Sequence, residues 1–523
     1  MSDHVKPIKV IDLFAGPGGL GEGFTAFRTQ SGQRPFKIAL SIEKEASAHR
    51  TLTLRSLFRQ FSPEDVPESY YAFMRGELGG SPEDELYKLP ELKDAYESAS
   101  REAAQLELGK NYQKVYRAIS EALKGDECIL LGGPPCQAYS LVGRARNFGG
   151  SGSYDADADN RNFLYVEYLR IIARFQPMAF VMENVKGLLS AKTAAGPVFD
   201  RILSDLKDPC KSVSTKLEAG RSRHRYRIFS FVKGSQTGDL FSAGSLMPQD
   251  YVIKSELYGI PQARHRVILL GLREDLISEV EPQTLLPCEK SYSVSEAIND
   301  LPAVRSGLSK QEDIQSEWAK IPVNLIKELK NNDQISKELW RELEKASTKT
   351  QNLDRGAEFG LTSTNLIAGT LREWYQDPRL GKYITNHTTR GHMAEDIARY
   401  WFASVFAQND KKQSPRLADF PEELLPKHKN VGEKIFTDRF RVQLAGRPST
   451  TITSHISKDG HYFIHPDPKQ MRSLTVREAA RLQTFPDNYH FVGNRTEQYV
   501  QVGNAVPPKL AIQLASALEG IIS

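Results

Sequence analysis

The chain has 523 residues and a mass of 58.7 kDa, which at roughly 150 residues per domain allows two to four domains. Apolar residues make up 40% and charged residues 26%, ordinary values for a globular protein that exclude an intrinsically disordered chain. No apolar run reaches the length of about 18 residues that a membrane helix needs. The net charge of +4 neither requires nor excludes a nucleic-acid partner. The first residues lack the apolar segment of a signal peptide, and the cysteines are too few for a disulfide framework, so we expect a cytoplasmic protein.

A glycine-rich turn between two predicted strands is the first functional signal. Residues 8–14 are an apolar, β-branched run typical of a buried parallel strand, and residues 36–42 are a second one that ends in Glu43. Between them, residues 16–21 fit the pattern G-x-G-x-x-G at the opening of a helix, where glycine lets a ligand approach the backbone N–H groups. Glu43 would then accept the ribose hydroxyls of a nucleoside cofactor. The pattern does not decide between NAD and S-adenosylmethionine, and a tight turn without a ligand is the alternative.

Predicted strands and helices alternate along the first half of the chain and then lose that rhythm. A polar stretch at 61–124 has apolar residues at helical spacing in its second half, so we expect surface helices inserted into the order of the sheet. Further strands are predicted at 128–131, 178–182 and 267–272, with a helix at 163–175. This alternation predicts a doubly wound α/β domain with a mostly parallel sheet. Residues 273–470 are irregular and predict a separate domain with a helix at 393–408; helices return at 475–482 and 508–522.

Polar residues gather at the carboxyl ends of the predicted strands, where ligands bind in open α/β sheets. Cys136 follows a strand and two prolines, a poor place for a packing cysteine and a good one for a nucleophile. Glu183 closes an apolar strand, where partial desolvation would favour its protonated form and let it donate to a ring nitrogen; an ion-paired or helix-capping carboxylate is the alternative. Arg264 and Arg266 lie two apart and are expected on one face, suited to a phosphate or a carbonyl oxygen gaining charge, or else at a solvated strand end.

Two further patterns allow more than one interpretation. The segment RSRHRYR carries alternating arginines at 221, 223, 225 and 227, which on one strand face would track nucleic-acid phosphates or would protect an edge strand from aggregation. His461 and His465 have HxxxH spacing, but they lie between a glycine and a proline in a segment that predicts a strand, so they would not stack as a pair of metal ligands. We therefore expect no metal site.

Six blocks of the sequence resemble the DNA cytosine-5 methyltransferases and occur in that family's usual order. They are IDLFAGPGGLGEGF, GGPPCQAYS, ENV, GIPQARHR, RSLTVREAARLQTFPD and QVGNAVPP. The resemblance implies a Rossmann-like, S-adenosylmethionine-dependent catalytic domain over residues 1–272, with the helical insertion at about 61–124. It also implies a smaller target-recognition domain over 273–470 and a C-terminal segment, 471–523, that completes the catalytic domain.

The same resemblance implies roles for individual residues. Cys136 would be the thiolate that adds to carbon 6 of cytosine, and Glu183 would hydrogen-bond to or protonate ring N3. Arg266 would hold the cytosine O2, while Arg264 would support the loop that carries Cys136. The positions that match DNA-binding residues of the family, or a residue that supports its DNA-binding loop, are Gln137, Ser140 and Thr453.

The cofactor positions of the family match residues from both ends of the chain. They are Phe14, Gly16, Gly18, Glu43, Pro135, Asn504 and Ala505. One position of the family has no clear match in this sequence, namely the acidic residue that binds the adenine amino group. Glu77 and Asp126 are the candidates, and the sequence does not choose between them.

The implied substrate is a cytosine flipped out of a short, specific duplex DNA sequence, and the implied setting is the modification half of a restriction–modification pair with a separately acting endonuclease. We expect a monomer that works at the nucleoid. A tRNA cytosine-5 methyltransferase is an alternative, although that subgroup carries a Cys-Phe-Thr tripeptide that this chain lacks. A catalytically silent DNA-binding relative is another, although it would have no need for Cys136 and Glu183. An NAD-dependent dehydrogenase shares only the first glycine turn.

Overall fold

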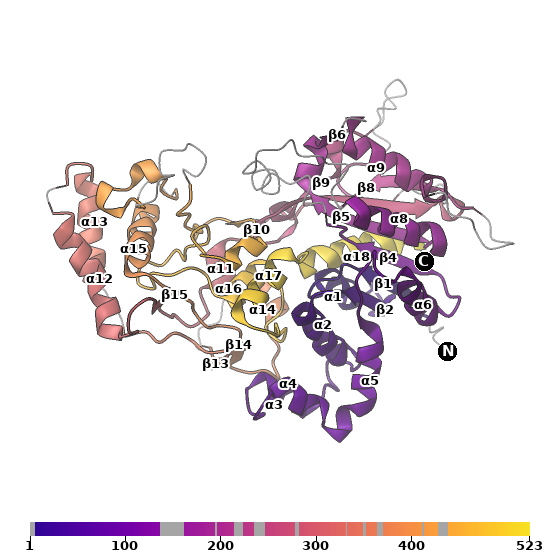
Figure 1. The fold of residues 1–523 in the computed structure, drawn as a ribbon, viewed down its shortest axis with the longest axis horizontal. Helices are drawn as coiled ribbons and strands as arrows, with labels where there is room; N and C mark the ends of the chain where they lie inside the picture. Colours follow the sequence, from indigo (N-terminus) through magenta and orange to yellow (C-terminus); the bar gives the residue numbers. More distant parts are fainter. Residues whose placement is uncertain are drawn as a thin grey trace.

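The structure is a computed structural model. It describes residues 6–135, 162–193, 196–213, 223–234, 246–277, 282–330, 332–348, 352–362, 370–409, 413–426 and 438–522. In Figure 1 an α/β body lies on the right and a mainly helical region, residues 282–470, extends to the left; we call the latter the second region. No helix among the described residues is both long and apolar enough to cross a membrane.

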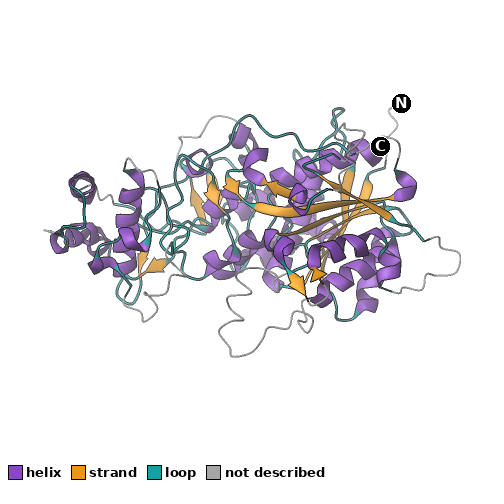
Figure 2. Ribbon diagram, turned by 90° about the horizontal axis from the view of Figure 1, so that it is seen from above, coloured by secondary structure: helices purple, strands orange, loops and turns teal. Residues whose placement is uncertain are grey.

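The α/β body is built on one sheet, whose strand order is β3-β2-β1-β4-β5-β11-β8 with β9 added beside β11. The strands are β1 (Ile8–Leu13), β2 (Phe36–Glu43), β3 (Ala103–Gln105), β4 (Cys128–Gly132), β5 (Ala179–Val185), β8 (Tyr226–Ser230), β9 (Val252–Lys254) and β11 (His265–Arg273). The first five in that order are parallel, and β11 runs antiparallel to both β5 and β8. Strands rich in buried Val, Ile and Leu suit a sheet that helices cover on both faces, as Figure 2 shows.

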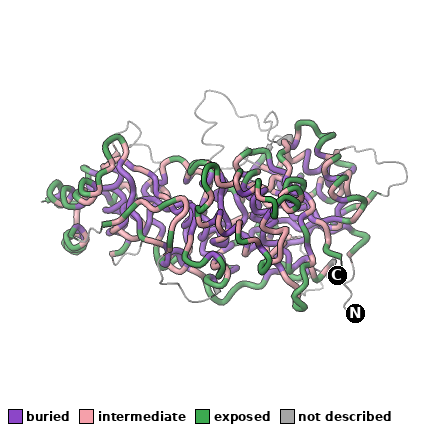
Figure 3. Tube along the Cα trace, turned by 90° about the horizontal axis from the view of Figure 1, so that it is seen from below, coloured by how far each residue is buried: buried purple, intermediate pink, exposed green. Residues whose placement is uncertain are grey.

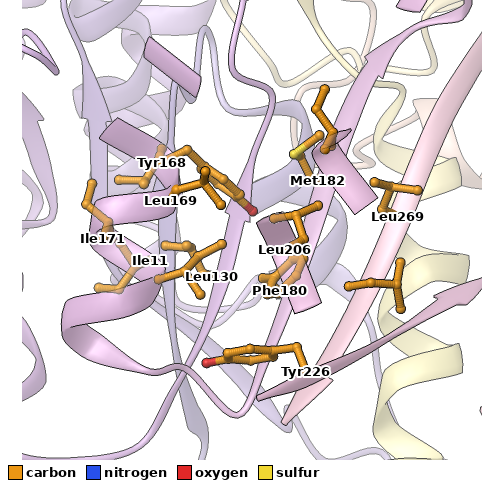
Figure 4. Close-up of a cluster of buried hydrophobic side chains, with 14 of the residues drawn as sticks. Ile11, Leu130, Tyr168, Leu169, Ile171, Phe180, Met182, Leu206, Tyr226 and Leu269 are labelled. Carbon is orange, nitrogen blue, oxygen red and sulfur yellow. The ribbon is translucent and has the colours of Figure 1, made fainter. Parts of the chain in front are cut away.

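Alternate side chains of the strands enter two separate apolar layers. One layer, part of which is drawn in Figure 4, lies under α6 (Tyr112–Leu123), α8 (Asn162–Phe175) and α9 (Val198–Lys207). The other lies under α1 (Gly19–Ala26) and α18 (Pro508–Ile522). Ile11 of β1 points into the first layer and Val10 into the second, as the period of two in a strand requires. Figure 3 shows these buried segments as the interior of the body.

The two ends of the chain meet in this body. A Cβ built on Gly23 of α1 would lie 2.3 Å from the Cβ of Ala511 in α18, so only glycine allows the two helices to pack this closely. The C-terminal elements are α16 (Val476–Leu482), α17 (Arg495–Asn504) and α18. In Figure 1 the yellow C-terminal helix accordingly lies beside the indigo N-terminal strands. The helices predicted at 475–482 and 508–522 are confirmed.

The stretch predicted as inserted helices contains a strand of the sheet. After α2 (Ala46–Arg59) come α3 (Glu68–Met74), α4 (Pro82–Tyr87) and α5 (Lys93–Glu102). Residues 103–105 then form β3, which pairs in parallel with β2, and α6 covers the sheet. The predicted helical character is confirmed by α5 and α6, but it was wrong for residues 103–105. A strand of three residues is too short to show a period, and its identity depends on its partner.

The second region has its own apolar core and little regular strand. Its helices are α11 (Val294–Ile298), α12 (Gln315–Glu328), α13 (Lys337–Ser347), α14 (Thr370–Tyr375) and α15 (Ala394–Gln408), and its short strands are β12 (Gly307–Leu308), β13 (Phe359–Leu361), β14 (Tyr383–Thr385), β15 (Gly391–His392) and β16 (Ser449–Thr450). Trp318 and Trp401 are almost fully buried between α12, α13 and α15. The helix predicted at 393–408 is confirmed as α15.

Candidate active site

The glycine turn after β1 adopts the left-handed backbone that its glycines permit. Gly16 has φ +57° and Gly18 has φ +97°, and the Gly18 N–H donates to the Ala15 carbonyl at 2.9 Å. Phe14 also has a positive φ of 56°, which is uncommon for a residue with a side chain and often marks a functional turn. A Cβ on Gly16 would meet no atom within 4 Å, so the space above this residue is open. The turn then leads directly into α1 at Gly19.

Glu43, at the end of β2, faces this turn. Its carboxylate Oε2 accepts the Gly16 N–H at 2.8 Å, while Oε1 accepts the N–H groups of Lys44 and Glu45, each at 2.8 Å. Its exposed fraction is 9%, so the carboxylate is buried at the strand end. A carboxylate oxygen can accept two hydrogen bonds, and Oε2 receives one from the described residues. It therefore retains capacity for one ligand hydroxyl.

Neither candidate for the adenine-binding acid lies at a strand's carboxyl end. Glu77 follows α3 and pairs with Arg75 at 2.6 Å, and Asp126 precedes β4 and pairs with Lys6 at 2.8 Å. The neighbouring strand end is that of β3, where the Leu106 N–H donates to the Glu43 carbonyl at 3.1 Å. The polar side chains there are Gln105 and Glu107. Sequence reasoning missed this position because it missed β3.

Cys136, Gln137 and Ser140 lie outside the described residues, but the segment that leads to Cys136 does not. Pro134 accepts a hydrogen bond from the buried Asn184 Nδ2 at 3.1 Å, which ties this segment to the end of β5. A Cβ on Gly133 would lie 3.0 Å from Glu183 Oε2. The Glu183 carboxylate therefore lies against the backbone that precedes Pro135.

Glu183 forms an ion pair with Arg266, the arrangement that the sequence left open as its alternative. Arg266 Nε lies 2.8 Å from Glu183 Oε1, and each side chain is 14% exposed. The pair forms because β11 runs antiparallel to β5, with Arg266 opposite Val185 and Ile268 opposite Glu183. Two charged groups that come from distant parts of the sequence thus meet at the edge of the sheet where the Cys136 segment begins.

Arg264 and Arg266 have different polar partners, although Arg264 lies within electrostatic reach of both Arg266 and Glu183. Arg264 is buried, and its Nη1 donates to the carbonyls of Ile452 and Gly503 at 2.8 and 3.3 Å. Burial, and then the charge of Arg266, lowers the pKa of Arg264 well below its usual range. The difference arises because the chain before β11 forms the separate short strand β10 (Gln262–Ala263), which pairs with β16. Arg264 thus fastens the second region and α17 to the sheet.

Thr453, Asn504 and Ala505 lie between the contacts of Arg264 and the glycine turn. Thr453 is half-buried and precedes a single turn of helix at Ser454–Ser457. A Cβ on Gly503 would lie 2.3 Å from the Thr453 carbonyl carbon, so α17 packs directly on this residue. Asn504 ends α17 and is exposed, whereas Ala505 is buried. The next residue, Val506, places its carbonyl oxygen 2.1 Å from a Cβ built on Gly19. Asn504 and Ala505 therefore lie close to the turn that opens α1.

Three of the alternating arginines, at 223, 225 and 227, lie at the opposite end of the sheet. Tyr226 of β8 pairs with Arg273, at the other end of β11 from Arg266. Arg223 is engaged with Asp208, whose carboxylate lies 2.6 Å from its Nη2. Because β8 is the last strand in the sheet order, this placement favours the charged edge strand over a surface that tracks phosphates near the site. Arg221 lies outside the described residues.

The two histidines with HxxxH spacing have hydrogen-bond partners of their own. His461 Nδ1 lies 2.7 Å from the Tyr400 hydroxyl, and His465 Nδ1 accepts the Asp467 N–H at 3.1 Å. Burial lowers the pKa of both imidazoles, to about 4 for His465. Within the described part of the chain, no three His, Cys, Asp or Glu side chains are grouped so that they could hold a metal ion.

Comparison with known proteins assigns this arrangement to a family. Residues 90–234 and 249–520 match the model of the C-5 cytosine-specific DNA methylases. The chain is 32% identical to the type II methyltransferase M.Bpa9945I of Bacillus paralicheniformis, over 98% of this chain and 99% of that protein. It is 25% identical to the type II methyltransferase M.AgeI of Thalassovita gelatinovora, over 99% and 100% of the two chains.

A solved structure shares the fold. One described as a DNA modification methyltransferase encoded within a prophage (E. coli) superposes with a TM-score of 0.53 at 18% identity, covering 98% of this chain and 99% of that one. The family model matches most of the length of the chain. The glycine turn and the Glu183–Arg266 pair lie within segments that resemble this family's motifs. The chain belongs to the C-5 cytosine-specific DNA methylase family and is a DNA (cytosine-5-)-methyltransferase.

Proposed function

We propose that the enzyme transfers the methyl group of S-adenosylmethionine to carbon 5 of a cytosine flipped out of a short, specific duplex sequence. We propose further that it is the modification enzyme of a restriction–modification system and acts as a monomer in the cytoplasm, at the nucleoid. The two relatives described above, M.Bpa9945I and M.AgeI, are named type II methyltransferases. The observation that carries the proposal is that Glu183 and Arg266 pair at the end of β5 beside Gly133 and Pro134, which lead to Cys136.

The residues around the glycine turn fit S-adenosylmethionine. The open space above Gly16 admits a ligand to the backbone, and Glu43 Oε2 can accept a ribose hydroxyl. Phe14, Gly18, Pro135, Asn504 and Ala505 would complete the pocket. When bound, the cofactor would supply a methyl group on a positively charged sulfur, ready for transfer to a carbon nucleophile.

The adenine would lie beside the end of β3. Gln105 Nε2 donates to the Lys44 carbonyl at 3.3 Å, which leaves its amide oxygen to accept from the adenine amino group. Glu107, two residues further along, offers a carboxylate at the same strand end. Gln105→Ala and Glu107→Gln would test whether the adenine lies here, and Glu77→Gln is the matched control. Weaker binding of S-adenosylmethionine by either of the first two variants, measured by calorimetry, supports the assignment; an effect of Glu77→Gln alone contradicts it.

The chemistry needs a nucleophile because carbon 5 of cytosine is too weakly nucleophilic by itself. The Cys136 thiolate would add to carbon 6, which makes carbon 5 electron-rich. Glu183 would hydrogen-bond to ring N3, and Arg266 would hold O2, so that both stabilise the charge that develops on the ring. After transfer, a base removes the carbon 5 proton, and elimination breaks the bond to sulfur and regenerates the thiolate of Cys136.

Flipping brings the stacked base to these groups at a cost of a few kcal/mol. Gln137, Ser140 and Thr453 would contact the DNA or support the segments that do so. Of these, Thr453 is the one that the structure describes, at the junction between the second region and α17.

The decisive experiment is the trapping of the covalent intermediate. Duplex DNA that contains 5-fluorocytosine cannot lose the group at carbon 5, so the wild-type enzyme should remain bonded to it in the presence of S-adenosylmethionine. Cys136→Ser should form no adduct and transfer no methyl group, yet bind duplex DNA. An active Cys136→Ser enzyme would overturn the mechanism. Preferential methylation of tRNA would favour the alternative substrate, and the absence of any adduct with the wild type would favour a silent relative.

The biological role requires a different measurement. Bisulfite sequencing of genomic DNA from cells with and without the gene should show one methylated motif that depends on the gene. Protection of the same motif from an endonuclease present in the same cells would establish the restriction–modification pair. Methylation scattered without a motif would contradict it.

A further inference from the structure

The inserted helix α3 packs against the second region, more than 280 residues further along the chain. In Figure 1, α3 and α4 lie at the bottom of the molecule beside β13 and β14, while β5 and β10 of the site lie above them. We call the contact between α3 with its following turn (residues 68–76) and residues 359–362 and 371–383 the brace. It is separate from the attachment that Arg264 makes at β10 and β16.

Polar contacts give the brace a defined register. The Tyr71 hydroxyl donates to Asp377 Oδ2 at 2.8 Å. The guanidinium of Arg379 lies over the Tyr71 ring, 4.4 Å from its centroid, and donates to the Glu64 carbonyl at 3.1 Å. A hydroxyl on a carboxylate and a guanidinium over a ring both depend on orientation, so they specify one geometry between the two surfaces.

Apolar contacts fill the space beside these groups. The ring of Phe73 packs edge-on against Phe359 at 5.8 Å, and Phe359 stacks on His490 at 5.2 Å with an interplanar angle of 8°. A Cβ on Gly76 would lie 2.8 Å from the Phe359 Cβ, so this contact has no room for a larger residue. Leu380, from the second region, is 3% exposed within the same cluster.

The brace is also joined to the body that carries the glycine turn. Asp377 Oδ2 accepts a second hydrogen bond from Asn488 Nδ2 at 2.8 Å, and Asn488 accepts one from Arg55 of α2 at 3.1 Å. Arg55 forms a buried ion pair with Glu22 of α1. Asp377 is therefore held from both sides, by α3 and by the C-terminal segment next to α2.

We propose that the brace fixes the second region relative to the catalytic sheet, so that Tyr71 and Arg379 are positioning residues for DNA binding. The second region is also joined to the C-terminal segment, where Arg477 Nε donates to the Thr385 carbonyl at 2.9 Å and Arg481 Nη1 donates to the Ala297 carbonyl at 3.1 Å. The brace adds an attachment on the side of the inserted helices, and each further attachment narrows the rotation that remains between the two parts. Because DNA must contact the second region and the flipped base must reach Glu183 and Arg266, a fixed placement lowers the cost of binding. It does not alter the chemistry after binding.

The test compares Tyr71→Phe, Arg379→Ala and the double variant with wild-type enzyme, using genomic DNA from a host without 5-methylcytosine as substrate. Loss of one such contact should raise the KM for DNA roughly fivefold, since a net hydrogen bond of about 1 kcal/mol corresponds to that factor. The kcat and the Kd for S-adenosylmethionine should stay within twofold of wild type. Hydrogen exchange at residues 359–361 and 383–385 should become faster.

Tyr87→Phe is the matched control. Tyr87 belongs to α4 of the same insertion and stacks on Tyr96 at 4.3 Å, and its hydroxyl has no hydrogen-bond partner among the described residues. It should leave the KM for DNA unchanged. An unchanged KM in Tyr71→Phe and Arg379→Ala, or an equal rise in Tyr87→Phe, would overturn the proposal. A fall in kcat or in thermal stability without a rise in KM would show a merely structural role and overturn it as well.

Discussion

Arg266 and Glu183 form an ion pair between two antiparallel neighbours of the sheet, with Arg266 Nε 2.8 Å from Glu183 Oε1. The pair lies at the end of β5, where the backbone of Gly133 approaches Glu183 Oε2. The carboxylate has one oxygen on the Arg266 guanidinium and the other beside Gly133, so it is held in one orientation. Such preorganisation reduces the rearrangement that the reaction requires.

Replacing Glu183 by Gln should therefore reduce methyl transfer far more than DNA binding. The amide keeps the shape but can neither pair with Arg266 as an anion nor give a proton to ring N3 as proposed, so we expect a fall in kcat on the order of 10²- to 10⁴-fold. Radiolabelled methyl transfer under single-turnover conditions measures it. Glu256→Gln is the control, because Glu256 pairs with His265 at 2.8 Å close by. A Glu183→Gln enzyme with wild-type kcat would remove Glu183 from the mechanism.

Gly19→Ala should destabilise the protein and disturb the glycine turn. The added Cβ would lie 2.1 Å from the Val506 carbonyl oxygen, a backbone atom that cannot move without shifting α18. Overpacking of this kind costs about 1–3 kcal/mol. The free energy of unfolding, measured with denaturant, should fall, and the affinity for S-adenosylmethionine should fall as well. Gly79→Ala is the control, since its Cβ would meet nothing within 4 Å; a loss as large there would refute the packing argument.

Substitutions of the two arginines should separate stability from activity. Arg264→Met leaves the buried carbonyls of Ile452 and Gly503 without their donor, and each such loss costs about 1–3 kcal/mol. Chemical denaturation should show a clear loss of stability. Arg266→Ala should instead mainly lower kcat/KM for DNA, because the partly buried Arg266 pairs with Glu183 and does not hold the second region. The reverse pattern would show that the two roles have been exchanged.

Acid should destabilise the protein in part through His490. Burial, and then the charges of Arg477 and Arg50, lowers the pKa of His490 to about 3, from an unfolded value of 6.5. Glu358 is the acidic group that faces it, 3.9 Å from its Nε2. The unfolded state therefore binds the proton first, so stability is fully present above pH 6.5 and is lost as the pH falls toward 3. The loss at pH 5 should be about 2 kcal/mol relative to pH 8.

Denaturant unfolding of His490→Gln at these two pH values checks this. Glutamine does not titrate, so the variant should lose less stability on acidification, whatever its stability at pH 8. His49→Gln removes an imidazole from α2 and serves as the comparison. Equal acid sensitivity in wild type and His490→Gln would contradict the linkage.

The sequence alone predicted five strands of the sheet, β1, β2, β4, β5 and β11, and the order of the motifs that follow or precede them. Strands such as β1 and β5 are mainly apolar runs whose burial can be predicted without knowledge of their partners. The motifs placed Glu43, Glu183 and Arg266 at strand ends, where a parallel sheet gathers its ligands. The family followed from the same blocks of residues.

Tertiary structure decided what depends on partners rather than on local pattern. β3 is a strand because β2 lies beside it, and its three residues show no period that could announce it. Arg264 and Arg266, two residues apart, have different roles because a change of strand partner between β10 and β11 sends one side chain to buried carbonyls and the other to Glu183. The docking of α3 on the second region joins surfaces that the sequence keeps far apart, and pairwise geometry of that kind is set by packing in three dimensions.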